Sequence, residues 1–189
     1  MAGLYDAKGR RRYLTISESQ VFLKELAFLS RDERLLCLYL LYCGTRISEA
    51  LSFKKADLDV AAGEVIVRTL KQRGEENFRR IPLPLFLLTE LQDLKIHSRY
   101  RVWRFSRSTA WRIVKKVMKR ADIEGVHATC KGLRHSFGVR TLHSSKEAKV
   151  TDLQKLMGHK DLKTTLIYVN VMGDELRELM QPGWDALES

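Results

Sequence analysis

The sequence contains no apolar run of the length that a membrane-spanning helix requires. Its longest run extends only from Leu35 to Cys43, whereas a spanning helix needs about 20 apolar residues. The first residues, Met1 to Asp6, also lack the apolar stretch of a secretory signal peptide. We therefore expect a cytoplasmic protein with no membrane partner, and we interpret residues 35–43 as part of a buried helix.

Cysteine is also scarce. Cys37, Cys43 and Cys130 are odd in number and lack the spacing of metal ligands. We therefore expect three reduced thiols in the core and no metal site built on them. The sequence also has no internal repeat and no low-complexity segment.

Acidic residues are in deficit. The 189 residues include 34 Lys and Arg against 23 Asp and Glu, which gives a net charge of +11. A surplus of this size on a folded domain favours a polyanion as partner. The length and the hydrophobic fraction of 44% suit one globular domain with a substantial core.

Capping motifs mark the first helices. Residues 15–18 (TISE) and 30–33 (SRDE) are capping boxes, which predict two helix starts. The second helix is apolar on nearly all sides and should end at Gly44. Apolar residues at helical spacing predict further helices near residues 85–94, 106–121, 131–142, 150–157, 161–168 and 171–180.

Between residues 57 and 81 the period of the apolar residues changes to two. Residues 64–70 are rich in β-branched side chains, and residues 78–81 return after a turn. The sequence therefore predicts an α+β fold that is mostly helical with one small antiparallel β-sheet. Lys71 lies in the turn, where it is either a solvated hairpin residue or a mobile proton donor that reaches into a cleft.

The helix expected after Ser106 or Ser108 has an apolar stripe and a strongly basic remainder. We assign Trp111, like Trp103, to the core. Few acidic residues are interspersed among these Lys and Arg residues. The pattern therefore suits a helix face that contacts phosphates at least as well as one that faces solvent. The candidate nucleic-acid contacts are Arg112, Lys115, Lys116, Lys119 and Arg120 of this helix and Arg73 of the hairpin.

The last third of the chain carries several reactive side chains. Lys131 and Arg134 share one face of a predicted helix, and His135 follows directly. His159 comes after a glycine, and Tyr168 is expected on the following short helix. A positive face, an imidazole and a hydroxyl nucleophile together suit attack on a phosphodiester.

Upstream, Arg46 at the start of a short helix supplies a further guanidinium, and Glu49 is placed to orient it. Taken alone, three of these residues have structural explanations. Arg46 would cap carbonyls at the end of the buried helix, Tyr168 would be an interfacial anchor, and His159 a helix-end cap. The joint pattern, in which a buried guanidinium wants a polar partner, favours a catalytic site.

These residues resemble the motifs of one family, the tyrosine recombinases, also called phage integrases, in their catalytic domain. The family's arginine box is similar to residues 44–51, and its hairpin lysine to Lys71. Its helical box, usually His-x-x-Arg-His, resembles residues 131–135. Its Leu-Gly-His box resembles residues 156–159, and its nucleophile matches Tyr168.

The resemblance covers about residues 13 to 180 and implies the tyrosine-recombinase catalytic-domain fold. Residues 1–12 are then a basic tail and residues 181–189 a C-terminal tail, without the N-terminal core-binding domain that most members carry. Lys131 stands where histidine is usual, as it does in some members, so a neutral imidazole base is not expected at that position.

The resemblance also implies a mechanism. Tyr168 attacks a DNA phosphodiester, forming a 3′-phosphotyrosyl link and a free 5′-hydroxyl, and a second 5′-hydroxyl reverses the step. Neither ATP nor a metal nor any other cofactor is expected. Arg46 and Arg134 hold the nonbridging oxygens, and His159 adds a hydrogen bond. Nearby cations are expected to lower the pKa of Tyr168, and either Lys131 or His135 could assist the loss of its proton.

The remaining residues take supporting roles in the same scheme. Lys71 protonates the leaving 5′-oxygen, and Lys131 mainly holds phosphate. His135 is expected behind the site, braced against the backbone, and Glu49 orients Arg46. No carboxylate cluster that would suit two metal ions is visible around these residues.

Three functions remain open at this point. The first is a site-specific DNA recombinase or integrase of a mobile element. It would be a homo-tetramer on double-stranded DNA, held through residues 171–180, and a monomer in free solution. The second is a catalytically silent DNA-binding module, and the third a relaxing enzyme of the type IB topoisomerase kind. The complete set of site residues favours catalysis, by a protein associated with the nucleoid.

Overall fold

The computed structural model describes residues 3–69, 77–144, 147–169 and 185. Within them the fold is mostly helical with one small antiparallel sheet, which confirms the predicted fold class. The elements are α1 (Ile16–Glu25), α2 (Arg31–Cys43), α3 (Ile47–Ser52), β1 (Leu58–Asp59), β2 (Glu64–Thr69), β3 (Asn77–Pro82), α4 (Leu85–Gln92), α5 (Arg107–Arg120), α6 (Cys130–His143), α7 (Val150–Met157) and α8 (Leu162–Leu166).

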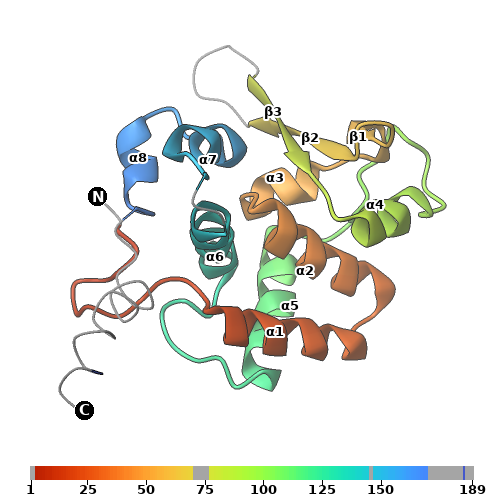
Figure 1. Ribbon diagram of the computed structural model, residues 1–189. Helices are drawn as coiled ribbons and strands as arrows, with labels where there is room; N and C mark the ends of the chain where they lie inside the picture. The colour runs from red at the N-terminus through yellow and green to blue at the C-terminus, as the bar shows by residue number, and fades with distance from the viewer. Residues whose placement is uncertain (1–2, 70–76, 145–146, 170–184, 186–189) are drawn as a thin grey trace.

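Helix α2 is the centre of the core. Leu35, Leu36 and Leu40 have no exposed surface, and α4, α5 and α6 all pack against this helix. Helix α6 also contacts α7, which packs on α8, so α6 lies between α2 and the α7–α8 pair (Figure 1). The three cysteines are buried and reduced, as predicted.

The small sheet packs beside α3 and α7. Its strands run antiparallel in the order β1-β2-β3. Val65, Val67 and Ile81 are buried on one face of the sheet. Strand β2 contacts α3, and β3 contacts α7. Residues 70–76 between β2 and β3, where Lys71 and Arg73 were predicted to lie in a turn, are outside the described residues.

Residues 3–12, which belong to the basic tail expected at residues 1–12, pack onto the domain. Leu4 is buried in the core, and Tyr5 forms an isolated bridge with Arg11. Arg11 in turn pairs with Glu18 at the start of α1. A buried apolar side chain and an ion pair thus connect this short segment to the rest of the domain.

The assignment of Trp111 to the core is wrong. Trp111 is 47% exposed on α5, whereas Trp103 is buried as predicted. The buried stripe of α5 consists of Ala110, Ile113, Val114, Val117 and Met118. Because each helical residue advances by about 100°, position 111 falls beside this stripe and faces outward with the basic residues.

Helix α2 begins and ends as its capping motifs predict. Ser30 and Glu33 form the capping box at its start, and Gly44 at its end adopts a φ of +56°. A Cβ atom at Gly44 would overlap the ring of Phe137 on α6. A left-handed backbone and a close helix approach therefore both require glycine at this position.

Gly44→Ala is expected to lower the free energy of unfolding by about 3 kcal/mol, because alanine strains a left-handed backbone and its methyl group overlaps a packed ring. Gly63→Ala is the matched control. Gly63 has a φ of +69° but nothing within 4 Å of its Cβ position, so the loss there should be about 1 kcal/mol. Urea denaturation measures both losses. Equal losses would contradict a role for the Phe137 contact.

Candidate active site

One cavity brings most of the predicted site residues together. It has a volume of about 270 Å³. It is lined from the start of α3, from α6 and from the segment after α7 by Arg46, Lys131, Arg134, His135, His159, Lys163, Thr164, Ile167 and Tyr168. Five of the six residues predicted as catalytic therefore meet at this cavity, and the sixth is Lys71. Lys71 lies outside the described residues.

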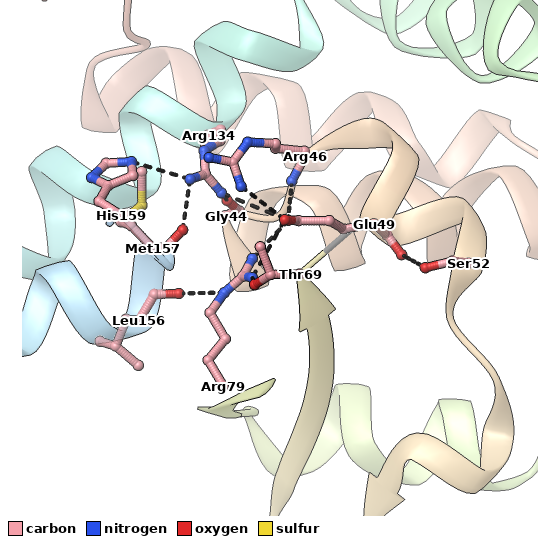
Figure 2. Close-up of polar contacts among 10 residues, drawn as sticks. All are labelled: Gly44, Arg46, Glu49, Ser52, Thr69, Arg79, Arg134, Leu156, Met157 and His159. Atoms are coloured by element: carbon pink, nitrogen blue, oxygen red, sulfur yellow. Dashed lines mark hydrogen bonds and ion pairs between the residues drawn. The ribbon is translucent and has the colours of Figure 1, made fainter. Parts of the chain in front are cut away.

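Arg134 is the buried cation of the site. Its Nη1 donates to the carbonyl of Gly44 at 2.6 Å, and its Nη2 donates to the carbonyl of Met157 at 2.7 Å (Figure 2). Burial, followed by the charge of Arg46, lowers its pKa to about 10, so it stays protonated at neutral pH. The nearest oxygen of Glu49, Oε2, lies 3.9 Å from Nη1 of Arg134. The positive charge is thus only partly compensated, and an anion in the cavity would complete its pairing.

Arg46 differs from the buried guanidinium that the sequence led us to expect. Its side chain is 46% exposed, and it begins α3 as the N-cap residue. The carbonyl at the end of α2, which Arg46 was considered to cap, is bound by Arg134 instead. Glu49 does orient Arg46: the Glu49 carboxylate accepts from both its Nη1 and its backbone N–H, each at 2.8 Å.

Glu49 is held by a second arginine that the sequence did not indicate. Arg79 on β3 donates from Nη2 to Glu49 Oε2 at 2.7 Å. Burial by itself raises the pKa of Glu49. The hydrogen bond and charge of Arg79, together with Arg46, hold that pKa below its usual value. The carboxylate therefore stays ionised between two guanidinium groups.

His159 is a neutral imidazole fixed by two partners. Its Nε2 accepts from Arg134 Nη2 at 3.2 Å, and its Nδ1 lies 3.0 Å from the Thr165 hydroxyl oxygen. Because Arg134 can only donate, we assign the ring proton to Nδ1. Burial and then the charge of Arg134 lower the pKa of His159 to about 4. The ring also stacks on that of Tyr168, with centroids 6.3 Å apart.

Tyr168 lies just beyond α8, not on it, because α8 ends at Leu166. The side chain is 1% exposed, and its hydroxyl lies 2.9 Å from Nδ1 of His135. Burial raises the pKa of Tyr168 to about 12, although Arg134 and Arg46 act in the opposite direction. The expectation of a lowered pKa is therefore wrong in its net sign, since burial outweighs the cations.

His135 contacts the tyrosine and not the backbone, which corrects the predicted bracing role. Burial, and then the charges of Lys131 and Arg134, lower the pKa of His135 to about 4. The neutral Nδ1 therefore accepts from the Tyr168 hydroxyl, and the proton sits on Nε2. That Nε2 is buried without a hydrogen-bond partner in the described part of the chain. A neutral imidazole thus lies beside the candidate nucleophile.

Several residues around the site escaped sequence reasoning. Arg79 had a signal: it lies two residues before the buried Ile81 on β3 and shares its face, so a charge falls at a position where an apolar residue is usual. Thr165 gave no signal beyond its place before Tyr168, yet its side chain is fully buried against His159. The cavity lining adds Lys163, Thr164 and Ile167.

The basic side of α5 is only partly available to a partner. Lys115 donates to a backbone carbonyl at 3.0 Å. Arg120 pairs with Glu25 at 2.9 Å and covers the ring of Phe28. The side chains on α5 that are exposed and basic without one of these contacts are Arg112, Lys116 and Lys119, together with Arg107 at the start of the helix, which the sequence analysis did not single out.

No group of three or more His, Cys, Asp or Glu side chains that could hold a metal ion occurs among residues 3–69, 77–144, 147–169 and 185. No helix in the same ranges is long and apolar enough to cross a membrane.

The buried histidines predict instability in acid. His135 and His159 have folded pKa values of about 4, against about 6.5 in an unfolded chain. Burial, and then the charge of Arg11, also lowers the pKa of His127. Their contribution to stability is therefore present above pH 6.5 and is lost as the pH falls through 6.5 towards 4, because the unfolded state binds more protons.

His135→Gln should reduce this acid sensitivity. Between pH 7.5 and pH 4.5, the variant is expected to lose about 2 kcal/mol less unfolding free energy than the parent protein. Urea denaturation at the two pH values measures the difference. His97→Gln is the control, because His97 is exposed. An unchanged acid sensitivity in His135→Gln would contradict a depressed pKa.

The family model described as the phage integrase family matches residues 12–174. The chain belongs to this family. The match confirms the resemblance drawn from the arginine box, the helical box and Tyr168, and it includes the whole lining of the cavity.

Curated relatives are tyrosine recombinases. XerA of Thermococcus onnurineus is 31% identical over 186 residues, which cover 92% of this chain and 63% of the relative. XerD of Shewanella oneidensis is 30% identical over 188 residues, covering 88% and 60%. The chain thus spans about three-fifths of the length of these relatives.

Solved structures share the fold. The crystal structure of XerA recombinase aligns with a TM-score of 0.75 at 22% identity, over 90% of this chain and 64% of that one. The XerH site-specific recombinase bound to palindromic difH substrate, a post-cleavage complex, aligns with a TM-score of 0.74 at 21% identity, over 95% and 56%.

Proposed function

We propose that the chain carries the active site of a site-specific DNA recombinase that cuts and rejoins strands through a 3′-phosphotyrosyl intermediate. The observation that carries this proposal is the single cavity lined by two arginines, two neutral histidines and Tyr168. Membership of the phage integrase family and the tyrosine recombinases among its relatives support it.

The cavity suits a phosphodiester. The carboxylate that pairs with Arg134 in the described part of the chain, Glu49, lies 3.9 Å from its Nη1, and Arg46 is half exposed at the cavity wall. Guanidinium groups stay protonated and place paired N–H groups on nonbridging oxygens. Lys131 is exposed on the same lining and would add a further contact to phosphate. Negative charge that develops on the phosphorane would thus meet donors already in place.

The nucleophile has a proton acceptor in contact. In the proposed step, the Tyr168 oxygen attacks phosphorus while its proton moves to Nδ1 of His135. With a pKa of about 12 on the donor and about 4 on the acceptor, complete transfer before attack is strongly uphill. The proton therefore moves as the phosphorus–oxygen bond forms.

The leaving group completes the first step. The bond from phosphorus to the 5′-oxygen breaks, and Lys71 supplies the proton in this proposal. His159 can donate to a nonbridging oxygen only when the ring nitrogen that faces the phosphate carries a proton. A bound anion would favour that protonated form, because it raises the pKa of His159. Attack by a second 5′-hydroxyl reverses each bond change and returns the proton to Tyr168, so no ATP is consumed.

DNA binding is part of the same proposal. XerH has been solved bound to difH substrate, and the net charge of +11 suits double-stranded DNA here. The exposed basic side chains of α5 and Arg73 are the proposed contacts to the DNA phosphate backbone. Assembly as a homo-tetramer on DNA, through residues 171–180, also stays a prediction, since that segment lies outside the described residues.

Covalent trapping tests the proposal. A library of duplexes with one nick and randomised flanking sequence is incubated with the protein in chelator, and products are separated under denaturing conditions. A nick lets the cut end diffuse away, so the protein–DNA adduct accumulates. We expect an adduct without metal, mapped to Tyr168 by mass spectrometry of the nucleotide-bearing peptide. Sequencing the trapped DNA then reports the site.

Each other outcome has a defined meaning. Salt-sensitive DNA binding without an adduct would overturn the catalytic proposal in favour of the silent module. An adduct that requires added metal would contradict the proposed chemistry. Relaxation of supercoiled DNA without exchange between two trapped-site duplexes would favour the type IB topoisomerase activity.

A further inference from the structure

Arg79 is a charged residue at a core position of the sheet. It pairs with Val67 across the β2–β3 ladder and shares its face with Ile81. Both neighbours are buried, and the Arg79 side chain is only 6% exposed. A guanidinium so placed must be satisfied by the surrounding protein. Its partners therefore indicate what it is there to hold.

The partners come from three separate segments. Arg79 Nε donates to the carbonyl of Leu156 at 2.8 Å, at the end of α7. Nη1 donates to the hydroxyl of Thr69 at 3.1 Å, at the end of β2. Nη2 donates to Glu49 on α3 at 2.7 Å. Figure 2 shows the guanidinium group between these segments, with Glu49 between it and Arg46.

Two of these contacts lead directly to residues that line the cavity. Glu49 binds Arg46 through both its side chain and its backbone N–H. Leu156 begins the turn to His159, and a Cβ at Gly158 in that turn would lie 3.0 Å from Arg79 Nη1. Arg79 itself is absent from the cavity lining. Apart from the long-range effect of its charge, it can therefore affect a bound phosphate only through its neighbours.

The charges explain why two arginines share one carboxylate. The Glu49 side chain is 1% exposed, and Arg46 is the more exposed of its partners. Without Arg79, the side chain of Arg46 would be the only one to hydrogen-bond the buried carboxylate, since Arg134 lies 3.9 Å from it. The carboxylate would then draw the Arg46 guanidinium group inward as a tight pair. Arg79 compensates the same carboxylate from the core side. Arg46 is then held by Glu49 while part of its donor edge remains available to the cavity.

We propose that Arg79 is a positioning residue for phosphate binding, which holds Arg46 through Glu49 and the turn before His159 through Leu156. This inference rests on the proposed function, because it assigns a purpose to that same cavity. Lysine at position 79 keeps the charge but cannot donate to three segments at once. Arg79→Lys is therefore the informative variant, since the buried carboxylate keeps a counter-ion.

The test compares charged and neutral phosphates. Nicked duplexes carry either a normal diester or an uncharged methylphosphonate at the scissile position. Arg46→Ala, the reference, should be slow on the diester and much less affected on the methylphosphonate, because the charge that Arg46 neutralises is gone. If Arg79 acts through Arg46, Arg79→Lys follows this pattern, with adduct formation about 100-fold slower on the diester and within about fivefold of the parent on the neutral linkage.

Arg80→Met is the matched control. Arg80 is the next residue on β3, faces the opposite side of the sheet, and forms exposed ion pairs with Asp59 and Glu64. Its loss should change neither rate by more than about twofold. Equal slowing of Arg79→Lys on both linkages would reveal a merely structural role and overturn the inference. So would a rate on the diester equal to that of the parent.

A second measurement separates this inference from the proposed function. If the parent protein forms no adduct on any duplex, the proposed function fails, and crystal structures of the parent and of Arg79→Lys decide the positioning role. A displaced Arg46 guanidinium group, or a shifted turn at Gly158, supports it. An unchanged Arg46 and an unchanged turn overturn it.

Discussion

Tyr168→Phe is expected to abolish the covalent protein–DNA adduct, a loss of at least roughly 10⁴-fold, because no other group can replace a missing nucleophile. The fold should be retained. The phenyl ring keeps its stacking on His159 and its contact with Gly138, where a Cβ would collide with the ring. The lost hydrogen bond to His135 should cost only about 1 kcal/mol of unfolding free energy.

The measurement is the denaturing gel with chelator, run beside a DNA-binding titration. Tyr100→Phe is the control, because it removes the same oxygen from an exposed ring. Binding by Tyr168→Phe should stay within about twofold of the parent, since a single buried hydroxyl contributes little to a phosphate-dominated interface. An adduct that persists in Tyr168→Phe would exclude Tyr168 as the nucleophile.

Arg134→Lys should show the second largest loss. We expect adduct formation to fall by about 10³-fold, because removing one preorganised donor from a developing anion costs 10²- to 10³-fold and lysine also loses the fork geometry. Arginine here donates to Gly44, Met157 and His159 at once. Lysine would leave at least one buried acceptor unsatisfied, which should lower the unfolding free energy by about 1–3 kcal/mol.

Arg140→Lys is the matched control for this substitution. Arg140 lies on the same helix, α6, and donates to the carbonyl of Leu41 near the end of α2 at 2.7 Å, but it does not line the cavity. Arg140→Lys should lower the unfolding free energy by a similar amount but leave the rate of adduct formation nearly unchanged. Single-turnover rates and urea denaturation of both variants separate the two effects. Comparable rate losses in both would argue that Arg134 acts only through stability.

The position of Arg134 also explains why its effect should exceed that of Arg46. Arg134 is buried, so its donors act where water screens little, whereas nearly half of the Arg46 side chain is exposed. The rotamer of Arg134 is also fixed by its hydrogen bonds to two backbone carbonyls. Arg46 depends instead on Glu49, and through Glu49 on Arg79.

Local patterns in the sequence were sufficient for most of the described secondary structure and for the motif residues that line the cavity. The capping boxes at residues 15–18 and 30–33 and the left-handed Gly44 depend only on neighbouring residues, so they could be predicted one by one. Arg46, Arg134, His159 and Tyr168 belong to short motifs whose order along the chain points to one chemistry. These inferences need no knowledge of distant contacts.

Only the tertiary structure decided the protonation states and the support of the site. Whether cations or burial controls the pKa of Tyr168 depends on how completely α6 and the segment after α7 exclude water. The contact from His135 to Tyr168 joins residues on different elements, and Arg79 reaches α3 and α7 from β3. Such contacts are set by packing, because a motif fixes which side chains are present but not which of them lose their water.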